Sequence, residues 1–157
     1  METTIETKVP ASKAFGPKCH NLEGFARSTG MNSDKVLILE DDMNFAGIVT
    51  QYFRSWGFAV NHVQDGVEGI KHIISEEYGV ILCDMLMPNL PGDMFYLAVE
   101  RMRPHLCDRF IFITGLQGNA KVAEFLKKVD GTLLPKPFQV DDLLDLVGFI
   151  QVKIGLC

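Results

Sequence analysis

Three acidic residues stand directly behind an aliphatic run. In the stretch VLILEDDMNF, residues 36–45, Glu40, Asp41 and Asp42 follow four aliphatic side chains. Carboxylates held this closely in a partly desolvated cleft repel one another, so either their pKa values rise or a cation neutralises them. The motif offers oxygen ligands without His or Cys, a donor set that selects Mg²⁺ or Mn²⁺. The cluster therefore predicts a binding site for a hard divalent cation.

Three further polar residues stand at the ends of later apolar runs. Asp84 follows VILC, Thr114 ends FIFIT, and Lys136 follows LLP. A carboxylate such as Asp84 can attack a phosphoryl group and hold it as an acyl phosphate. A metal ion, the Lys136 ammonium and the Thr114 hydroxyl would then share the three phosphoryl oxygens and stabilise a loose transition state. These positions together predict phosphoryl transfer to Asp84.

A parallel sheet is the architecture that would bring these residues together. From Lys35 onward, short aliphatic runs alternate with segments of helical period, the pattern of parallel strands joined by crossover helices. Ligands of such a sheet bind outside the carboxyl ends of its strands, where the residues above fall. The second predicted strand ends without a comparable residue. We predict five strands, at residues 36–39, 58–63, 80–83, 110–114 and 131–134.

Five helices are expected between and after these strands, because apolar residues recur there at spacings of three and four. The second helix covers residues 67–75, and Gly57 ends the first. The other four carry the stripes Phe45, Ile48, Val49, Tyr52, Phe53 and Trp56; Phe95, Ala98, Val99 and Met102; Val122, Phe125, Leu126 and Val129; and Val140, Leu143, Leu144 and Val147.

Composition and charge narrow the class of protein. With 157 residues, of which 47% are hydrophobic, the chain fits one globular domain with a sizeable core. A net charge of −5 argues against nucleic acid or an anionic membrane as partner. The apolar runs are shorter than the roughly 20 residues that a bilayer requires. Because the four cysteines lack C-x-x-C spacing and no signal-peptide pattern is present, we expect a cytoplasmic protein.

The first 33 residues differ from the rest in composition. They are rich in Thr, Ser, Pro, Gly and Lys and have weak periodicity. We expect residues 1–33 to form an extension that is flexible or docked, with a short helix near residues 21–27. Residues 34–157 would form the globular domain.

The stretches LILEDD, VILCDMLMP, FIFITG and LLPKPF resemble the four signature motifs of bacterial response-regulator receiver domains. The resemblance covers about residues 35–155. It implies a flavodoxin-like, doubly wound sheet of five parallel strands in the order 2-1-3-4-5, with five helices. It also implies that Mg²⁺ is held by Glu40, Asp41, Asp84 and the backbone carbonyl of Leu86, and that the bond between Lys136 and Pro137 is cis.

The same resemblance implies a role in a two-component system or phosphorelay. A histidine kinase or histidine phosphotransfer protein would phosphorylate Asp84, and the change would switch a face that binds an unknown downstream protein. The chain would be a signalling switch and not an enzyme, beyond its own autophosphorylation and autodephosphorylation. Because the chain ends soon after the fifth helix, we expect a stand-alone receiver or one excised from a larger protein. Pairing with a second copy stays open.

A departure from the family pattern and two positions that vary within the family bear on mechanism. Leu133 stands where receivers usually carry an aromatic residue, so a ring switch coupled to Thr114 cannot be carried over. Leu86 and Leu116 occupy two variable positions, two residues beyond the acceptor and two beyond Thr114. Since neither apolar side chain can orient an attacking water, we predict a long-lived acyl phosphate.

The same residues allow other interpretations. An Asp pair after a strand is often a helix cap, and we expect Asp42 to cap the first helix or to lie solvated beside the site. A haloacid dehalogenase-type phosphatase would need a D-x-D nucleophile motif after the first strand, and a flavodoxin a Gly/Ser/Thr-rich phosphate loop. A receiver-like module that has lost phosphorylation is a further alternative. The four motifs at strand ends favour the phosphorylated receiver.

Overall fold

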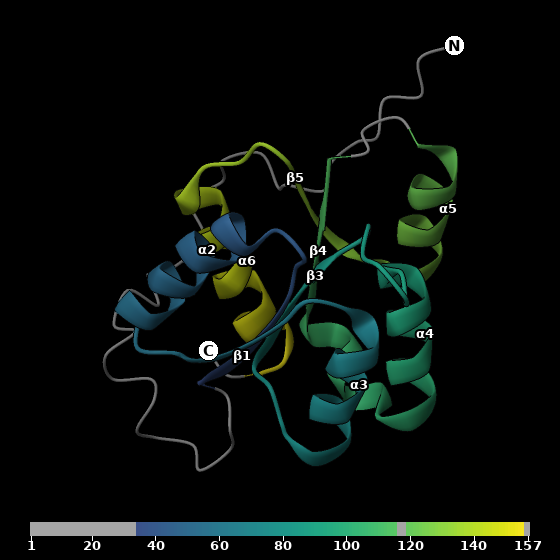
Figure 1. Cartoon of the computed structure of the whole chain (residues 1–157), viewed down its shortest axis with the longest axis horizontal. Coiled ribbons are helices and arrows are strands. Elements are labelled where there is room, and N and C mark those ends of the chain that lie inside the picture. The colour runs from purple at the N-terminus through teal and green to yellow at the C-terminus, as the bar shows by residue number, and fades with distance from the viewer. Residues whose placement is uncertain (1–33, 116–118, 156–157) are drawn as a thin grey trace.

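Five strands and five α-helices alternate in the part of the chain that the computed structural model describes, residues 34–115 and 119–155 (Figure 1). The predicted helix near residues 21–27 and Leu116 lie outside these ranges. Each predicted strand is present, and strand boundaries differ from prediction by at most one residue at either end. The elements are β1 (Lys35–Leu39), α2 (Met43–Ser55), β2 (Ala59–Val63), α3 (Gly66–Ser75), β3 (Val80–Asp84), α4 (Gly92–Met102), the 3₁₀ helix η1 (Pro104–Arg109), β4 (Phe110–Thr114), α5 (Ala120–Val129), β5 (Thr132–Pro135) and α6 (Val140–Lys153).

The strands form one parallel sheet in the order β2-β1-β3-β4-β5. This is the predicted flavodoxin-like order. After β1 the chain moves outward to β2, and it then returns to place β3 on the opposite side of β1. Strand order therefore reverses between β1 and β3, the position at which open parallel sheets bind their ligands.

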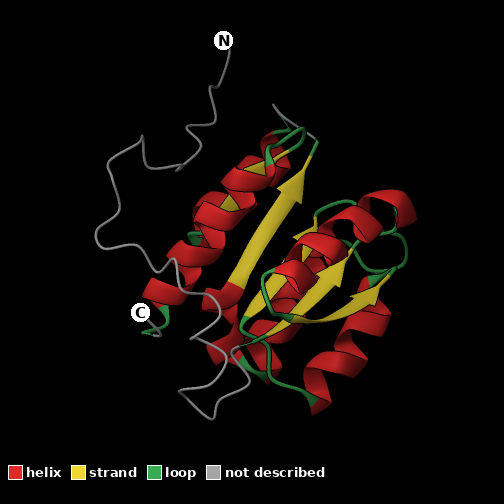
Figure 2. Cartoon of the chain, turned by 90° about the vertical axis from the view of Figure 1, so that its left-hand side faces the viewer, coloured by secondary structure: helices red, strands yellow, loops and turns green. Residues whose placement is uncertain are grey.

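Helices cover both faces of the sheet. Helices α2 and α6 lie on one face, and α3, α4 and α5 lie on the other (Figures 1 and 2). Successive side chains of β1 pack on opposite faces of the sheet. Val36 and Ile38 pack in the core with Phe53 of α2. Leu37 and Leu39 pack in the core with Phe95 of α4. Because both faces are covered, β3 and β4 are buried along their whole lengths.

The apolar stripe predicted for the first helix is only partly buried. The core residues of α2 are Ala46, Val49 and Phe53, while Ile48 is 56% exposed and Tyr52 is 40% exposed. The six predicted apolar residues spread over more of the helix circumference than the sheet can cover. Hydropathy alone cannot tell which of them face the strands, and it overlooks the small Ala46.

Helix α4 differs from the prediction in a similar way, because Met102 belongs to the predicted apolar stripe but is 43% exposed. Tyr96, which that stripe does not include, is buried instead and makes ring contacts with Phe110 and Phe125. Among the described residues, no helix combines the length and the apolar character needed to cross a bilayer.

Candidate functional site

Strand register places the predicted site residues at one level of the sheet. Leu39 of β1 pairs with Cys83 of β3, so Glu40 and Asp84 come next on neighbouring strands. Thr114 of β4 pairs with Pro135 of β5, and the backbone N–H of the following residue, Lys136, donates to the Thr114 carbonyl over 2.8 Å. The four strand ends therefore meet at the carboxyl edge.

Three carboxylates converge at this edge. Single oxygens of Glu40, Asp41 and Asp84 lie within 4.8 Å of one another. Glu40 is 1% exposed and Asp84 is 6% exposed, whereas Asp41 is open to solvent. A cluster of oxygen donors with one solvent-facing member fits a hard divalent cation that keeps part of its water shell, as Mg²⁺ does. Asp42 does not join the cluster, since its side chain accepts hydrogen bonds from the N–H groups of Asn44 and Phe45 and caps α2.

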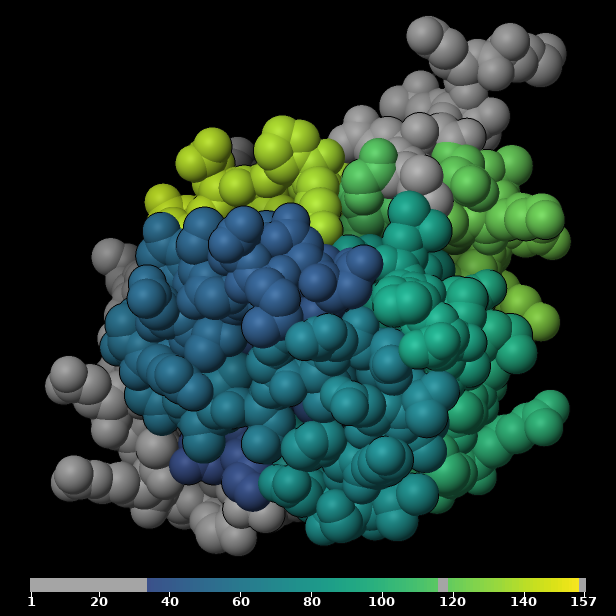
Figure 3. All heavy atoms as spheres, viewed as in Figure 1, coloured from purple at the N-terminus to yellow at the C-terminus, as the bar shows by residue number. Residues whose placement is uncertain are grey.

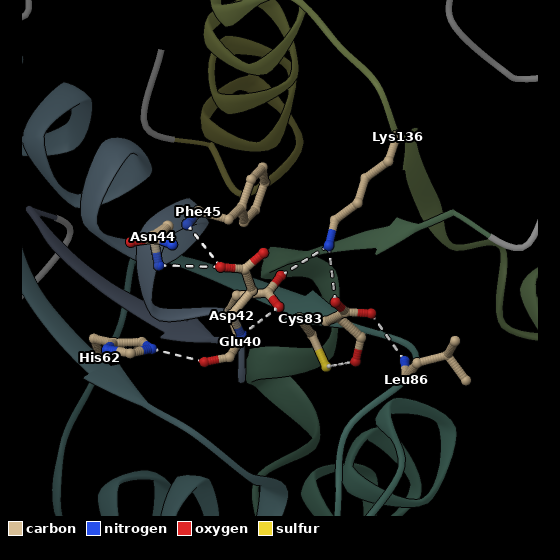
Figure 4. A network of polar contacts seen from close by, with 9 residues as sticks. Glu40, Asp42, Asn44, Phe45, His62, Cys83, Leu86 and Lys136 are labelled. Carbon is tan, nitrogen blue, oxygen red and sulfur yellow. Dashed lines mark hydrogen bonds and ion pairs between the residues drawn. The ribbon is translucent and has the colours of Figure 1, made fainter.

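Lys136 reaches into the cluster from the end of β5 (Figure 4). Its Nζ lies 3.0 Å from Glu40 Oε2 and 3.0 Å from Asp84 Oδ2. The same ammonium lies 4.5 Å from the centre of the Phe45 ring, which makes an edge-on contact with Phe138. The segments after β1 and β5, which are far apart in sequence, thus meet at the surface (Figure 3). The Lys136–Pro137 peptide bond is cis, as the resemblance implied.

The charges of the site are strongly coupled. The pKa of Glu40 is raised to about 7, mainly by burial; the neighbouring Asp84 carboxylate adds to the rise, while the N–H of Asp42 and the ammonium of Lys136 act in the opposite sense. Burial lowers the pKa of Lys136, but its ion pairs with Glu40 and Asp84 outweigh that effect, so the net shift is upward. One ammonium is therefore too little positive charge for this cluster, which is the condition that favours a bound cation.

The loop that follows Asp84 is held by several hydrogen bonds. The N–H of Leu86 donates to Asp84 Oδ1 over 2.9 Å, and the N–H of Gly92 donates to the Met85 carbonyl over 3.2 Å. The Asn89 side chain donates to Asp65 Oδ2 at the start of α3 over 2.9 Å. These contacts fix the backbone around Asp84, while the Leu86 side chain is 56% exposed.

One site residue was missed by the sequence reasoning, which expected nothing from the second strand. His62 of β2 places Nε2 2.8 Å from the carbonyl oxygen of Glu40 (Figure 4). No sequence pattern signals this contact, because the atom that His62 contacts belongs to the backbone of Glu40. The side chain of Glu40 faces a different group.

The predicted residues thus differ in how closely they gather. The structure brings together Glu40, Asp41, Asp84 and Lys136, and the backbone of Leu86 contacts Asp84. Thr114 is 3% exposed at the end of the adjacent strand β4. Their chemical roles stay predictions.

A family model for the response regulator receiver domain matches residues 36–148. The chain belongs to this family. The predicted fold and membership in two-component signalling are thereby confirmed. Leu133, which replaces the usual aromatic residue of such receivers, packs partly buried against the core on the α3, α4 and α5 side.

Curated relatives include a receiver protein that the match covers almost entirely, and much longer proteins. The response regulator receiver protein CpdR of Brucella abortus is 25% identical over 111 residues, which cover 71% of this chain and 91% of CpdR. The transcription factor SKN7 of Saccharomyces cerevisiae is 30% identical over 123 residues, which cover 78% of this chain but 20% of SKN7. The chain also spans only 45% of the transcriptional regulatory protein RprY of Bacteroides fragilis. The activities of those longer proteins therefore do not transfer to this receiver.

Solved structures give the same fold. The receiver domain of the Francisella response regulator 1452 is 26% identical, with a TM-score of 0.67, and the match covers 76% of this chain and 98% of that one. The receiver domain of the sensor histidine kinase PA1611 from Pseudomonas aeruginosa PAO1 is 25% identical, with a TM-score of 0.65, and the match covers 78% and 98% of the two chains. That structure has a magnesium ion coordinated in its active site cleft.

Proposed function

We propose that this receiver takes a phosphoryl group on Asp84 from a histidine kinase or a histidine phosphotransfer protein. The observation that carries the proposal is the position of Lys136 Nζ, 3.0 Å from an oxygen of Asp84 and 3.0 Å from one of Glu40. A buried carboxylate beside an ammonium and a second carboxylate suits an acceptor whose negative charge increases during the reaction.

The metal proposed for the site is Mg²⁺, with Glu40, Asp41, Asp84 and the backbone carbonyl of Leu86 as ligands. The convergence of the three carboxylates supports this set, and the hydrogen bond from the Leu86 N–H to Asp84 keeps that backbone beside the cluster. Mn²⁺ would suit the same oxygen donors. When bound, the ion would neutralise the carboxylates and the incoming phosphoryl oxygens.

Groups of the protein itself would orient Asp84 and bind the transferred phosphoryl group. Asp84 Oδ1 is held by the Leu86 N–H and Oδ2 by Lys136, so the carboxylate is oriented before a phosphoryl donor arrives. Lys136 and the Thr114 hydroxyl would each take one oxygen of the transferred group. Drawing these two residues inward would favour one of two arrangements of the β4 and β5 region, and a downstream protein would bind that arrangement.

The environment proposed for this switch is the cytoplasm, with proteins as its partners. Residues 1–33 would be an extension to the receiver and not a second domain. The family match argues against the phosphatase alternative. The position of Asp84 argues against it as well, because that alternative needs its nucleophile after the first strand, whereas Asp84 ends β3.

Acetyl phosphate, Mg²⁺ and intact-mass measurement test the proposal directly. The wild-type chain should gain the mass of one phosphate, and Asp84→Asn should not. Asp42→Asn is the matched control: it changes a neighbouring acid outside the cluster, and asparagine is an equally good helix cap. Chelation of the metal should abolish the gain. A mass gain that persists in Asp84→Asn would refute the assignment.

A further inference from the structure

We propose that His62 is a positioning residue for the metal site, acting on Asp41 through the backbone of Glu40. The inference deepens the proposed function and rests on it. It concerns a residue of the second strand, which the acceptor chemistry itself does not require.

The peptide unit after Glu40 is held by a side chain and not by the sheet ladder. Glu40 lies one residue beyond β1, and its N–H still donates to the Val63 carbonyl over 3.1 Å. Its carbonyl oxygen lies 2.8 Å from His62 Nε2 (Figure 4). Because a carbonyl oxygen can only accept, Nε2 must carry the proton in this contact. The His62 ring thus adds one hydrogen bond between β2 and the chain just beyond the end of the strand pairing.

The orientation of that carbonyl decides where Asp41 lies. The Glu40 carbonyl and the Asp41 N–H belong to one planar peptide unit, so turning the carbonyl also moves the Asp41 Cα. The Glu40 side chain is held independently, since Oε1 accepts from the Asp42 N–H over 3.1 Å and Oε2 pairs with Lys136. Asp41 is the exposed member of the carboxylate cluster. Loss of the His62 contact should therefore loosen Asp41 more than Glu40.

The contact can be removed with little effect on the strand itself. His62 stands opposite Ile38 in the parallel register of β2 with β1, and the backbone pairing of these strands does not depend on its ring. Its side chain is only half-buried on the edge strand. The adjacent Asn61 offers a matched control, because its Oδ1 accepts a hydrogen bond from the Tyr78 hydroxyl over 3.2 Å and its side chain makes no hydrogen bond to the acidic motif within the described residues.

The test is a direct titration of the full chain with Mg²⁺ by calorimetry, at one pH, for wild type, His62→Ala, His62→Gln and Asn61→Ala. We expect His62→Ala to raise the dissociation constant about five-fold, the equivalent of ~1 kcal/mol for one hydrogen bond. His62→Gln, whose amide can donate to the same carbonyl, should recover most of the affinity. Asn61→Ala should bind Mg²⁺ like wild type, even if urea unfolding shows it to be less stable.

Phosphorylation by acetyl phosphate supplies the second measurement. In His62→Ala the Mg²⁺ concentration for half-maximal rate should rise by the same factor, while the rate at saturating Mg²⁺ stays near that of wild type. If His62→Ala does not fold, His62→Leu keeps the bulk without the donor and should show the same loss.

Equal Mg²⁺ affinity in wild type and the donor-free variants would overturn the role of His62 while leaving the metal site intact. An equal loss in Asn61→Ala would also overturn it, because the effect would then belong to the strand as a whole. Absence of Mg²⁺ binding by wild type would instead refute the metal site, and this inference with it.

Discussion

Replacing Gly92 with alanine should distort the loop that follows Asp84, the proposed acceptor. A Cβ built on Gly92 would lie 2.6 Å from the carbonyl oxygen of Asp84 and 2.9 Å from the Cα of Met85, and real Cβ atoms essentially never approach closer than 3.0 Å. Both contacts are with backbone, so a side-chain rotation cannot relieve them. The loop would have to shift by roughly half an ångström, and overpacking of this kind costs about 2 kcal/mol.

Urea unfolding measures this cost. With a slope of roughly 2 kcal/mol per molar urea, the midpoint of Gly92→Ala should fall by about 1 M relative to wild type. The matched control is Gly148→Ala in α6, where an added Cβ would meet nothing within 4 Å. That change should stabilise the protein by about 0.5–1 kcal/mol, because alanine is the better helix former.

The same variant should respond in function, because the clash falls on the main chain of Asp84 itself. Phosphorylation by acetyl phosphate at saturating Mg²⁺ should be slower in Gly92→Ala than in Gly148→Ala. The reasoning is refuted if Gly92→Ala unfolds within about 0.5 kcal/mol of wild type while Gly148→Ala shows its expected gain.

Three other predictions address single groups of the site. Because burial raises the pKa of Glu40 to about 7 from 4.5, the folded state binds more protons than the unfolded state between these values. In metal-free buffer the contribution of Glu40 to stability should be fully present below pH 4.5 and be lost as the pH rises to about 7. Urea unfolding should show that the free energy of unfolding falls by up to ~3 kcal/mol over this pH range. Glu40→Gln should abolish this fall. The Phe45 ring 4.5 Å from Lys136 Nζ should contribute ~1 kcal/mol, and a double-mutant cycle of Phe45→Leu with Lys136→Met that gives no coupling would contradict this. Leu86→Asn should shorten the lifetime of the acyl phosphate, followed by intact mass after donor removal, whereas Ile74→Asn at an exposed position of α3 should leave it unchanged.

Strand ends were the most predictable feature of this molecule. The runs before Asp84 and up to Thr114 are continuously apolar because β3 and β4 are covered on both faces, and such runs end where polar residues begin. Parallel pairing of the strands is then enough to bring Glu40, Asp84 and Lys136 to one edge of the sheet. The carboxylate cluster could therefore be anticipated from a linear pattern.

Helix faces and backbone contacts were less accessible to sequence reasoning. Ile48 and Tyr52 belong to an apolar stripe but lie exposed, because the sheet covers only part of the α2 circumference. The contact of His62 with the Glu40 carbonyl depends on where the chain turns after β1, and residue types do not encode that direction. What was missed follows from three-dimensional packing and not from local propensity.

The ion pairs of Lys136 join residues separated by 96 and 52 positions in the chain. During synthesis, the acidic motif and Asp84 leave the ribosome well before Lys136, the residue that supplies their ammonium. A nascent chain can thus display all three carboxylates without their protein counter-charge, and β5 must dock at the sheet edge before the pocket is complete. The proposed competence to accept a phosphoryl group would therefore be acquired late in biogenesis.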